Sequence, residues 1–243
     1  MLTRCISAES RKLCHSMILP ACLLIPIIPA IMGTFNYLQN QGILESEWYS
    51  LWTQNTLFYA CFFFAPLIGL YCSYLWRLEH RHNNWNMIMT APVPVSCLFF
   101  AKLAVILAIT LLTQIWMGAL YLICGKLVGL PGFCPPEIIL WLLRGLLGAV
   151  PICSLQLLLS MKIRSFSVPI GIALIGSVTG MLIINNDMGL IWPYSLMLLG
   201  MNSNKTEDSL AGGLLPFLVS AAVFSLIFCG LSVWFLKHRD VHA

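Results

Sequence analysis

Long apolar runs separated by short polar segments dominate this chain and set its expected fold. Six of the runs are long enough to cross a bilayer core, which takes roughly 20 apolar residues of helix. They cover residues 16–38, 53–76, 97–123, 137–160, 167–186 and 210–236. The pattern predicts an all-α integral membrane protein in which residues 1–243 form a single transmembrane domain.

The first fifteen residues, MLTRCISAESRKLCH, mix charged and apolar positions ahead of the first run. This pattern predicts a short helix that lies at the membrane surface. The first run is longer than the core of a signal peptide and no small-x-small cleavage site follows it, so it is expected to stay as a transmembrane helix. Pro20, Pro26 and Pro29 fall inside it and predict a kink.

Two segments between the runs have less regular patterns. Residues 39–52 are polar, and their Trp48 and Trp52 suit an interfacial aromatic belt, so this segment is expected to be an outside loop. The segment GLIWPYSLMLLGM at 189–201 is apolar, but its roughly 13 residues are too few to cross the bilayer core. It predicts either an interfacial or a re-entrant segment before the last span.

Composition agrees with a membrane protein and excludes several other classes. Hydrophobic residues make up 59% of the chain, charged residues 9%, and the mean hydropathy is +0.88. The formal net charge of +4 does not indicate nucleic-acid binding, because no basic cluster carries interleaved aromatic residues. The basic residues lie mostly at the ends of apolar runs, where they indicate topology.

Counting these basic residues predicts the orientation, since loops on the cytoplasmic side are enriched in Lys and Arg. With both termini inside, the outside segments hold only Lys126 and Lys205. The inside segments hold the ten remaining basic residues other than Arg144: Arg4, Arg11, Lys12, Arg77, Arg81, Lys102, Lys162, Arg164, Lys237 and Arg239. We therefore expect a multi-pass membrane protein with both termini in the cytoplasm.

Ten cysteines are scattered through the chain without a C-x-x-C motif or metal-type Cys/His spacing, and most are expected to be small core residues. Cys124 and Cys134 bracket one short loop and could form a disulfide if that loop faces an oxidising compartment. In the fifth run, Gly176 and Gly180 form a G-x-x-x-G pattern, for which packing inside the bundle is favoured over a dimer face.

The chain carries no sequence motif for chemistry of its own. It has no G-x-x-x-x-G-K-S/T loop for a nucleoside triphosphate and no H-E-x-x-H zinc motif. His80 and His82 lie near Glu79, but the charged cluster reads as a solvated face rather than a metal site. Arg144 lies inside a predicted span, where it either reaches back to the outer interface or lines an external cavity.

The polar insert RLEHRHNNWNMIMTAPVP at 77–94 stands out between the second and third runs. As a helix over about 78–90 it places Leu78, Trp85, Ile88 and Met89 on one side, with polar residues on the other. Pro92 restricts the residue before it and should end the helix there. The insert therefore predicts a short amphipathic helix on the cytoplasmic side.

Taken together, this topology resembles the permease subunit of a type-2 ABC exporter. Within that group the chain is similar to permeases of immunity systems against lantibiotics or bacitracin. The resemblance spans essentially the whole chain, and is carried by Lys102 and four stretches: AESRKL at 8–13, NQGIL at 40–44, EWYSLWTQ at 47–54 and WRLEHRHNNWNMIMTAPVP at 76–94.

In such exporters the helix between spans two and three couples the permease to its ATPase, and the N-terminal surface helix contacts the same subunit. The resemblance thus implies contact with the ATPase at six residues: Glu79, Arg81, Trp85, Met87, Glu9 and Lys12. It also implies two ABC ATPase subunits that bind ATP and Mg²⁺, a second permease copy or a related permease, and no cofactor in this chain.

The resemblance also implies a location in the bacterial plasma membrane and, as function, the removal of an amphipathic peptide antibiotic from that membrane. Five residues with suitable aromatic or charged side chains are candidates for the substrate path: Trp48, Trp52, Trp192, Tyr194 and Arg144. Two alternatives stay open from the sequence. One is a non-transporting membrane sensor that works with a signalling kinase, and the other is an exporter of another lipid-like or drug substrate. An intramembrane enzyme is disfavoured, because no span carries a nucleophile and base pair.

Overall fold

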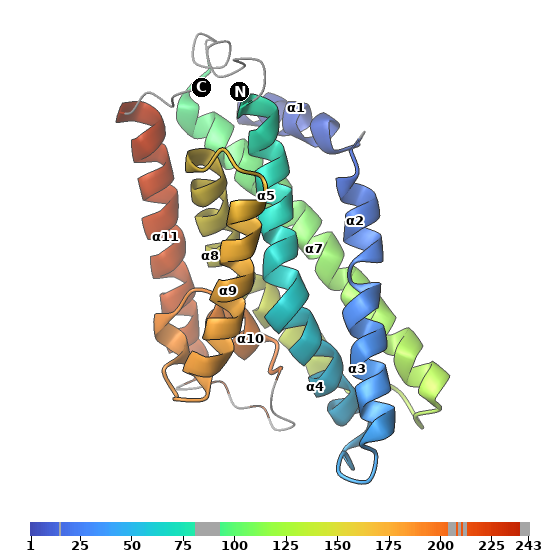
Figure 1. Ribbon diagram of the computed structural model, residues 1–243. Helices are drawn as coiled ribbons and strands as arrows, with labels where there is room; N and C mark the ends of the chain where they lie inside the picture. The colour runs from blue at the N-terminus through green and yellow to red at the C-terminus, as the bar shows by residue number, and fades with distance from the viewer. Residues whose placement is uncertain (15, 81–92, 204–207, 209, 211–212, 239–243) are drawn as a thin grey trace.

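The computed structural model describes residues 1–14, 16–80, 93–203, 208, 210 and 213–238, and the regular elements in these ranges are helices (Figure 1). In chain order they are α1 (Leu2–Cys14), α2 (Ile18–Leu24), α3 (Ile27–Gln39), α4 (Glu47–Phe58), the π-helix η1 (Tyr59–Phe64), α5 (Ala65–His80), α7 (Val95–Val128), α8 (Glu137–Lys162), α9 (Ser167–Ile184), the 3₁₀ turn η2 (Gly189–Ile191), α10 (Ser195–Gly200) and α11 (Leu214–His238).

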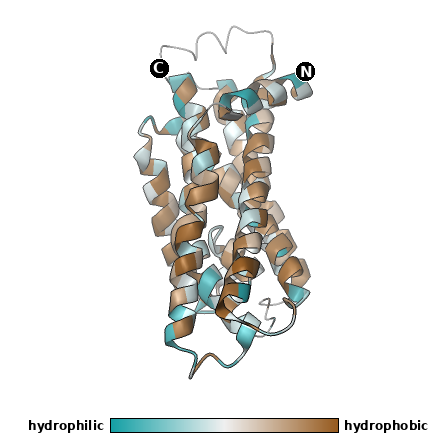
Figure 2. Cartoon of the chain, turned by 90° about the vertical axis from the view of Figure 1, so that its right-hand side faces the viewer, coloured by the Kyte–Doolittle hydropathy of each residue, from teal (hydrophilic) through white to brown (hydrophobic). Residues whose placement is uncertain are grey.

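Six of the helical stretches are long and apolar enough to cross a membrane, as the sequence predicts. They are Ile18–Gln39, Glu47–His80, Val95–Val128, Glu137–Lys162, Ser167–Ile184 and Leu214–His238. They run roughly side by side, and α1 lies across one end of them (Figure 1). Apolar residues dominate the length of these helices, whereas polar residues gather toward the two ends (Figure 2). The chain is an all-helical, multi-pass membrane protein.

The first span is interrupted at the predicted position. Helix α2 ends at Leu24, Ile25 and Pro26 form a turn, and α3 begins at Ile27 with Pro26 as its N-cap. Proline cannot donate a backbone hydrogen bond, so it is tolerated at a helix start and disrupts a helix interior. The break agrees with the kink expected from Pro20, Pro26 and Pro29.

The segment 39–52 differs from the expected outside loop, because α4 already begins at Glu47. Trp48 and Trp52 are not placed in an exposed aromatic belt, since they are 4% and 0% exposed. Their indole rings pack inside the bundle, where Gly125 of α7 leaves the space that the Trp48 ring occupies. Interfacial and buried tryptophans share the same local sequence pattern, so only the tertiary packing separates them.

The short segment after α9 is a buried part of the bundle. It consists of η2 and α10, which pack against α8 and α9, and both Leu196 and Met197 are fully buried. A side chain at Gly148 would meet the backbone at Leu196 and Met197. The segment is therefore packed among the helices instead of lying on the outside of the bundle, and the choice between a re-entrant and an interfacial segment stays a prediction.

The G-x-x-x-G pattern of α9 serves this packing inside the chain. A Cβ atom at Gly176 would lie 2.6 Å from the Tyr194 ring, and one at Gly180 would lie 3.0 Å from the backbone nitrogen of Ser195. The two glycines therefore admit the segment that leads into α10, and the prediction of packing within the bundle is confirmed. Cys124 and Cys134 are both free thiols in this structure, so the disulfide considered for them is not formed.

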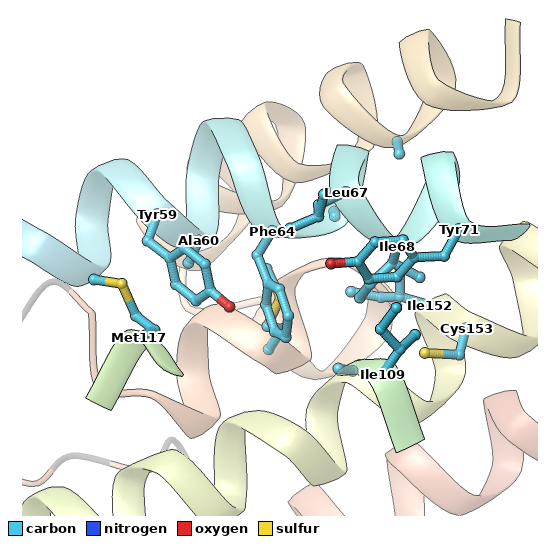
Figure 3. Close-up of a cluster of buried hydrophobic side chains, with 14 of the residues drawn as sticks. Tyr59, Ala60, Phe64, Leu67, Ile68, Tyr71, Ile109, Met117, Ile152 and Cys153 are labelled. Atoms are coloured by element: carbon cyan, nitrogen blue, oxygen red, sulfur yellow. The ribbon is translucent and has the colours of Figure 1, made fainter. Parts of the chain in front are cut away.

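The helix α1 and the end of α11 lie at the same end of the bundle (Figure 1). We call it the α1 end. The central span α4–η1–α5 forms the middle of the core, where Tyr59, Phe64, Ile68 and Tyr71 pack against residues of α7 and α8 (Figure 3). This span connects the α1 end to the opposite end and so joins the two regions described next.

Candidate functional site

Three helices meet at the α1 end, and each contributes charged side chains to one cluster. Helix α1 packs against α7, and the last turn of α5 lies beside the first turns of α7. Glu9 and Lys12 come from α1, Glu79 from the last turn of α5, and Lys102 from the second turn of α7. The predicted coupling helix, over about 78–90, begins at the end of α5, so the cluster lies close to its start in the sequence.

The four side chains form a closed ring of ion pairs, which we call the charge ring. The Lys12 ammonium donates to Glu9 Oε1 and to Glu79 Oε1, both at 2.6 Å. The Lys102 ammonium donates to Glu9 Oε2 at 2.8 Å and to Glu79 Oε1 at 2.9 Å. Each lysine therefore bridges both glutamates, and the ring carries no net charge.

The charge ring is largely removed from water. Lys102 is 0% exposed, and the side chains of Glu9 and Glu79 are each 3% exposed, whereas Lys12 is 31% exposed. The Lys102 ammonium also donates to the Leu75 carbonyl and lies 4.9 Å from the centre of the Trp76 ring. Buried charges are tolerated when they are paired and hydrogen-bonded, and each charge of this ring has two partners of opposite sign.

Helical periodicity explains how the sequence builds the ring. Glu9 and Lys12 are three residues apart on α1, so they share one face of that helix. The same face buries Leu13 against the bundle. Glu79 and Lys102 are 23 residues apart and are brought together by the return of the chain from α5 to α7. The ring thus ties α1, α5 and α7 to one another.

Lys12 is the most exposed member of the ring, and its pKa is changed by the two carboxylates that it binds. Burial lowers the pKa of this ammonium, but the carboxylates of Glu9 and Glu79 outweigh that effect, so the pKa lies above its ordinary value. An ammonium that donates to two carboxylates holds its proton more tightly than one in water. Lys12 therefore stays charged at any physiological pH.

The structure brings together three of the six residues expected at an ATPase contact. Glu9, Lys12 and Glu79 all belong to the charge ring, and the two glutamates are buried. Arg81, Trp85 and Met87 lie outside the described residues, as does most of the helix expected over about 78–90, of which residues 78–80 continue α5.

Lys102 is the residue that sequence reasoning missed as part of this site. In the sequence it served as one of the basic residues on the inside and as part of the family resemblance, but not as a residue of this site. A lysine in the second turn of a long apolar helix is itself a signal, because an intramembrane charge normally has a partner. The two available carboxylates, Glu9 and Glu79, were both already candidates for other reasons.

Of the residues proposed for a substrate path, Trp48 and Trp52 lie toward the opposite end of the bundle, where other aromatic rings surround them. The Trp48 indole donates to the Pro131 carbonyl, and the Trp52 indole donates to the Met201 carbonyl, both at 2.8 Å. The Trp52 ring lies 5.1 Å from the Tyr121 ring and 6.1 Å from the Trp141 ring. These residues join α4 to α7, α8 and the segment after α10.

Trp192 and Tyr194 lie deeper in the bundle, where they contact the middle of α9 and the second half of α8. The Trp192 indole donates to the Gly176 carbonyl at 2.9 Å, and the Tyr194 hydroxyl accepts from Gln156 Nε2 at 2.7 Å. Arg144 of α8 holds both carboxylate oxygens of Asp208 through one nitrogen, at 2.8 and 2.9 Å. Arg144 is thus paired with an acidic residue near the helix ends, which agrees with a side chain that reaches outward.

A comparison of the sequence with known protein families identifies the family of this chain. The sequence model of the family described as ABC-2 family transporter protein matches residues 5–180. The chain belongs to the ABC-2 transporter family. The match runs from α1 into α9 and includes all four residues of the charge ring, so this permease carries the ring within the family's own region. No curated protein and no solved structure matches the permease.

Membership decides the general role of the permease. It is the transmembrane, non-catalytic component of an ABC transporter, and the ATP is hydrolysed by partner ABC ATPase subunits. The chain therefore needs an element that receives a mechanical signal from those subunits. The charge ring lies where α1, α5 and α7 meet, and residues 81–92 follow α5 directly in the sequence.

Proposed function

We propose that the permease is the membrane subunit of an ATP-driven exporter that removes an amphipathic peptide antibiotic, of the bacitracin or lantibiotic type, from the membrane. Two ATPase subunits bind ATP and Mg²⁺ and act on two permeases, which are two copies of this chain or this chain and a related one. The α1 end and both termini face the cytoplasm. The peptide leaves from the outer leaflet at the opposite end.

The observation that carries this proposal is the charge ring at the α1 end. A buried ring of four alternating charges costs desolvation energy, which is offset only while all four partners stay in place. It therefore fixes α1, the end of α5 and the start of α7 as one rigid unit. Residues 81–92 connect α5 to α7 across this unit, so a force applied to them is transmitted to both helices.

In this proposal the six coupling residues have two kinds of role. Arg81, Trp85 and Met87 contact the ATPase, since a charge and a large aromatic side chain are typical of interface hot spots. Glu9, Lys12 and Glu79 hold the helices that carry the contact. The ATPase closes when it binds ATP, pushes the segment 81–92, and the charge ring passes the displacement into α1 and α5.

The positive charge on the α1 end supports the proposed orientation. The described basic side chains that end α5, α8 and α11 at this level are Arg77, Lys162 and Lys237, with Arg164 in the turn between α8 and α9. Glu137 and Asp208 lie at the opposite end, where Tyr49 and Arg144 bind them. An excess of Lys and Arg on one side marks the cytoplasmic face.

The five residues proposed for the substrate path support a peptide substrate, because an amphipathic peptide needs apolar and aromatic surface together with a few polar groups. Trp48, Trp52, Trp192, Tyr194 and Arg144 supply such groups. All five side chains are engaged with other parts of the chain in this structure. In our proposal the α10 segment moves during transport and exposes part of this surface to the peptide.

A resistance assay tests the proposed function. A strain without this gene, complemented with the wild-type chain, is expected to survive higher bacitracin or lantibiotic concentrations, whereas the Trp85→Ala variant restores no resistance although it inserts normally. Trp234→Ala is the matched control, because Trp234 is an exposed tryptophan of α11 that is far from the coupling segment in the sequence. Equal resistance with and without the chain would contradict the proposal.

A second readout separates transport from signalling. An exporter with Trp85→Ala loses ATP-dependent removal of labelled bacitracin from liposomes. A sensor that moves nothing shows no such removal with the wild-type chain either, but its Glu79→Ala variant changes the expression of resistance genes while ATP hydrolysis stays the same. These last results would contradict the proposed export and would show that the chain acts as a sensor.

A further inference from the structure

The central span changes its helical geometry midway. Residues Glu47–Phe58 and Ala65–His80 are α-helical, whereas Tyr59–Phe64 form a π-helix, whose turn contains more residues than an α turn. This span is the most enclosed of the six, with 67% of its apolar window buried against 50% or less for the others. We call residues 59–64 the wide turn.

Pro66 explains why the wide turn forms at this place. A proline has no N–H to donate to the carbonyl four residues earlier, which belongs to Phe62, and its ring clashes with that carbonyl in a regular α-helix. Opening the preceding turn by one residue relieves the clash. The helix then resumes as α5 from Ala65.

A hydroxyl from another helix supports the wide turn from outside. Ser177 of α9 donates to the carbonyl of Cys61 at 2.6 Å, and Ser177 is 0% exposed. The same hydroxyl lies 3.1 Å from the Leu174 carbonyl of its own helix. Cys61 lies in the middle of the wide turn, so a side chain from α9 binds a backbone carbonyl there in addition to the helix's own hydrogen bonds.

The two halves of the span are anchored to different partners. On the α4 side, the Trp52 indole binds the Met201 carbonyl just after α10. On the α5 side, Glu79 belongs to the charge ring. The wide turn itself packs through Tyr59, whose ring stacks on Phe64 at 4.7 Å and whose hydroxyl donates to Gln114 of α7 (Figure 3).

We propose that the wide turn is the pivot about which α5 tilts against α4 during transport, and that Ser177 is the residue that positions it. The inference rests on the proposed function. Helices bend at π turns and at prolines, because the ladder of backbone hydrogen bonds is interrupted there. A displacement of the charge ring therefore tilts α5 about residues 59–66, and α4 passes a smaller movement to the α10 segment through Trp52.

The helix α7 provides an internal standard for this pivot. It spans the same number of residues as the central span, 34 in each case, and it is one continuous α-helix. It also starts at the same charge ring, through Lys102. If the wide turn is a pivot, the central span bends there when the charge ring is displaced, whereas α7, which has the same number of residues, does not bend at the same depth.

Hydrogen–deuterium exchange on the full complex tests this difference. The permease is purified in nanodiscs with the ATPase that binds it, and exchange is compared between the nucleotide-free state and the state trapped with ATP and vanadate. Amides of residues 59–65 are expected to exchange about threefold faster or more in one of the two states, and amides of residues 103–116 to change little. Equal responses of both segments would overturn the pivot.

A substitution tests the role of Ser177. Ser177→Ala is expected to leave ATP hydrolysis within about twofold of the wild type, to lower export of labelled bacitracin per ATP by about threefold or more, and to shift Tm by no more than about 3 °C. Ser177→Cys keeps the size and a weaker donor, so it recovers part of the export. Ser225→Ala is the control, because Ser225 donates only within its own helix α11 and should change nothing.

A merely structural serine gives a different result, in which export and hydrolysis fall together as Tm falls, and this result would overturn the role of Ser177. Unchanged export in Ser177→Ala would overturn it as well. Failure of the proposed function is recognised separately, since the wild-type permease then binds no ATPase or exports no peptide. If the wild type binds an ATPase but exports no bacitracin, the exchange experiment still decides whether the pivot exists.

Discussion

The charge ring makes a quantitative prediction for Lys102. Replacing it by methionine keeps the length and apolar stem of the side chain but removes the ammonium that donates to Glu9 at 2.8 Å and to Glu79 at 2.9 Å. Two carboxylates that are each 3% exposed then share one ammonium, that of Lys12. The ring changes from neutral to a buried net charge of −1.

Removing one partner of a buried ion pair typically costs about 3–5 kcal/mol, because the remaining charge is left buried without compensation. We expect a loss of this size for Lys102→Met, which corresponds to a fall in Tm of roughly 10 °C for a chain of this length. The double variant Lys102→Met/Glu79→Gln leaves the neutral pair of Glu9 and Lys12. It should therefore be more stable than Lys102→Met alone.

Thermal unfolding of the purified permease in detergent, followed by intrinsic fluorescence, measures both effects. Lys237→Met is the control, because Lys237 is an exposed lysine in the last turn of α11 and its loss should change stability by less than about 0.5 kcal/mol. The reasoning is refuted if Lys102→Met is as stable as Lys237→Met. It is also refuted if the double variant loses the sum of the two single losses.

Three further predictions use other parts of the structure. Trp52→Phe loses the hydrogen bond to the Met201 carbonyl and should cost about 0.6–1.7 kcal/mol, measured by the same unfolding assay. Gly176→Ala should lower Tm by forcing the Tyr194 ring away, whereas Gly171→Ala, with nothing within 4 Å of the added Cβ, should not lower it. The pKa of Lys12 is raised in the folded state. The stabilisation that its ion pairs give to the folded state is therefore complete below the unfolded pKa of about 10.4, and it is lost as the pH rises through the higher folded pKa. The difference in Tm between wild type and Lys12→Met should thus stay constant from pH 7 to 9 and narrow above about pH 10.5.

The spans were readable from the sequence because a bilayer imposes one simple requirement. A helix that crosses it must be apolar over roughly 20 residues, and six runs met this condition. The first helix and the break at Pro26 were also predictable, since an amphipathic pattern and a proline each have a local structural consequence. The first 14 residues and the six spans therefore needed no tertiary information.

The burial of Trp48 and Trp52 could not be read in the same way. A tryptophan near the end of an apolar run suits either the headgroup region or a helix interface, and Gly125, the residue that makes room for Trp48, lies 77 positions further along the chain. The extent of α4 followed from the same packing. The segment 39–52 was therefore predicted as a loop, although its last six residues are helical.

The sequence predicted three members of the charge ring as site residues but not their pairing. Glu9, Lys12 and Glu79 were selected as candidates through the resemblance, but their pairing with Lys102 depends on how α5 and α7 return to the same level. The wide turn likewise depends on a contact between distant residues. Pro66 is a local cause of the irregular turn, whereas Ser177, which binds the Cys61 carbonyl, belongs to a helix more than a hundred residues later. Contacts of this range are set by the fold as a whole.

The central claim is that an ATPase acts on this permease through the segment that follows the charge ring. Affinity purification of the tagged chain from its own host, in mild detergent, tests this claim most directly, with bound proteins identified by mass spectrometry and Mg²⁺-dependent ATP hydrolysis measured in the eluate. The account predicts an ABC ATPase in an amount comparable to the permease, and its loss in Trp85→Ala. An eluate without an ATPase, or the same ATP hydrolysis with wild type and Trp85→Ala, would contradict it.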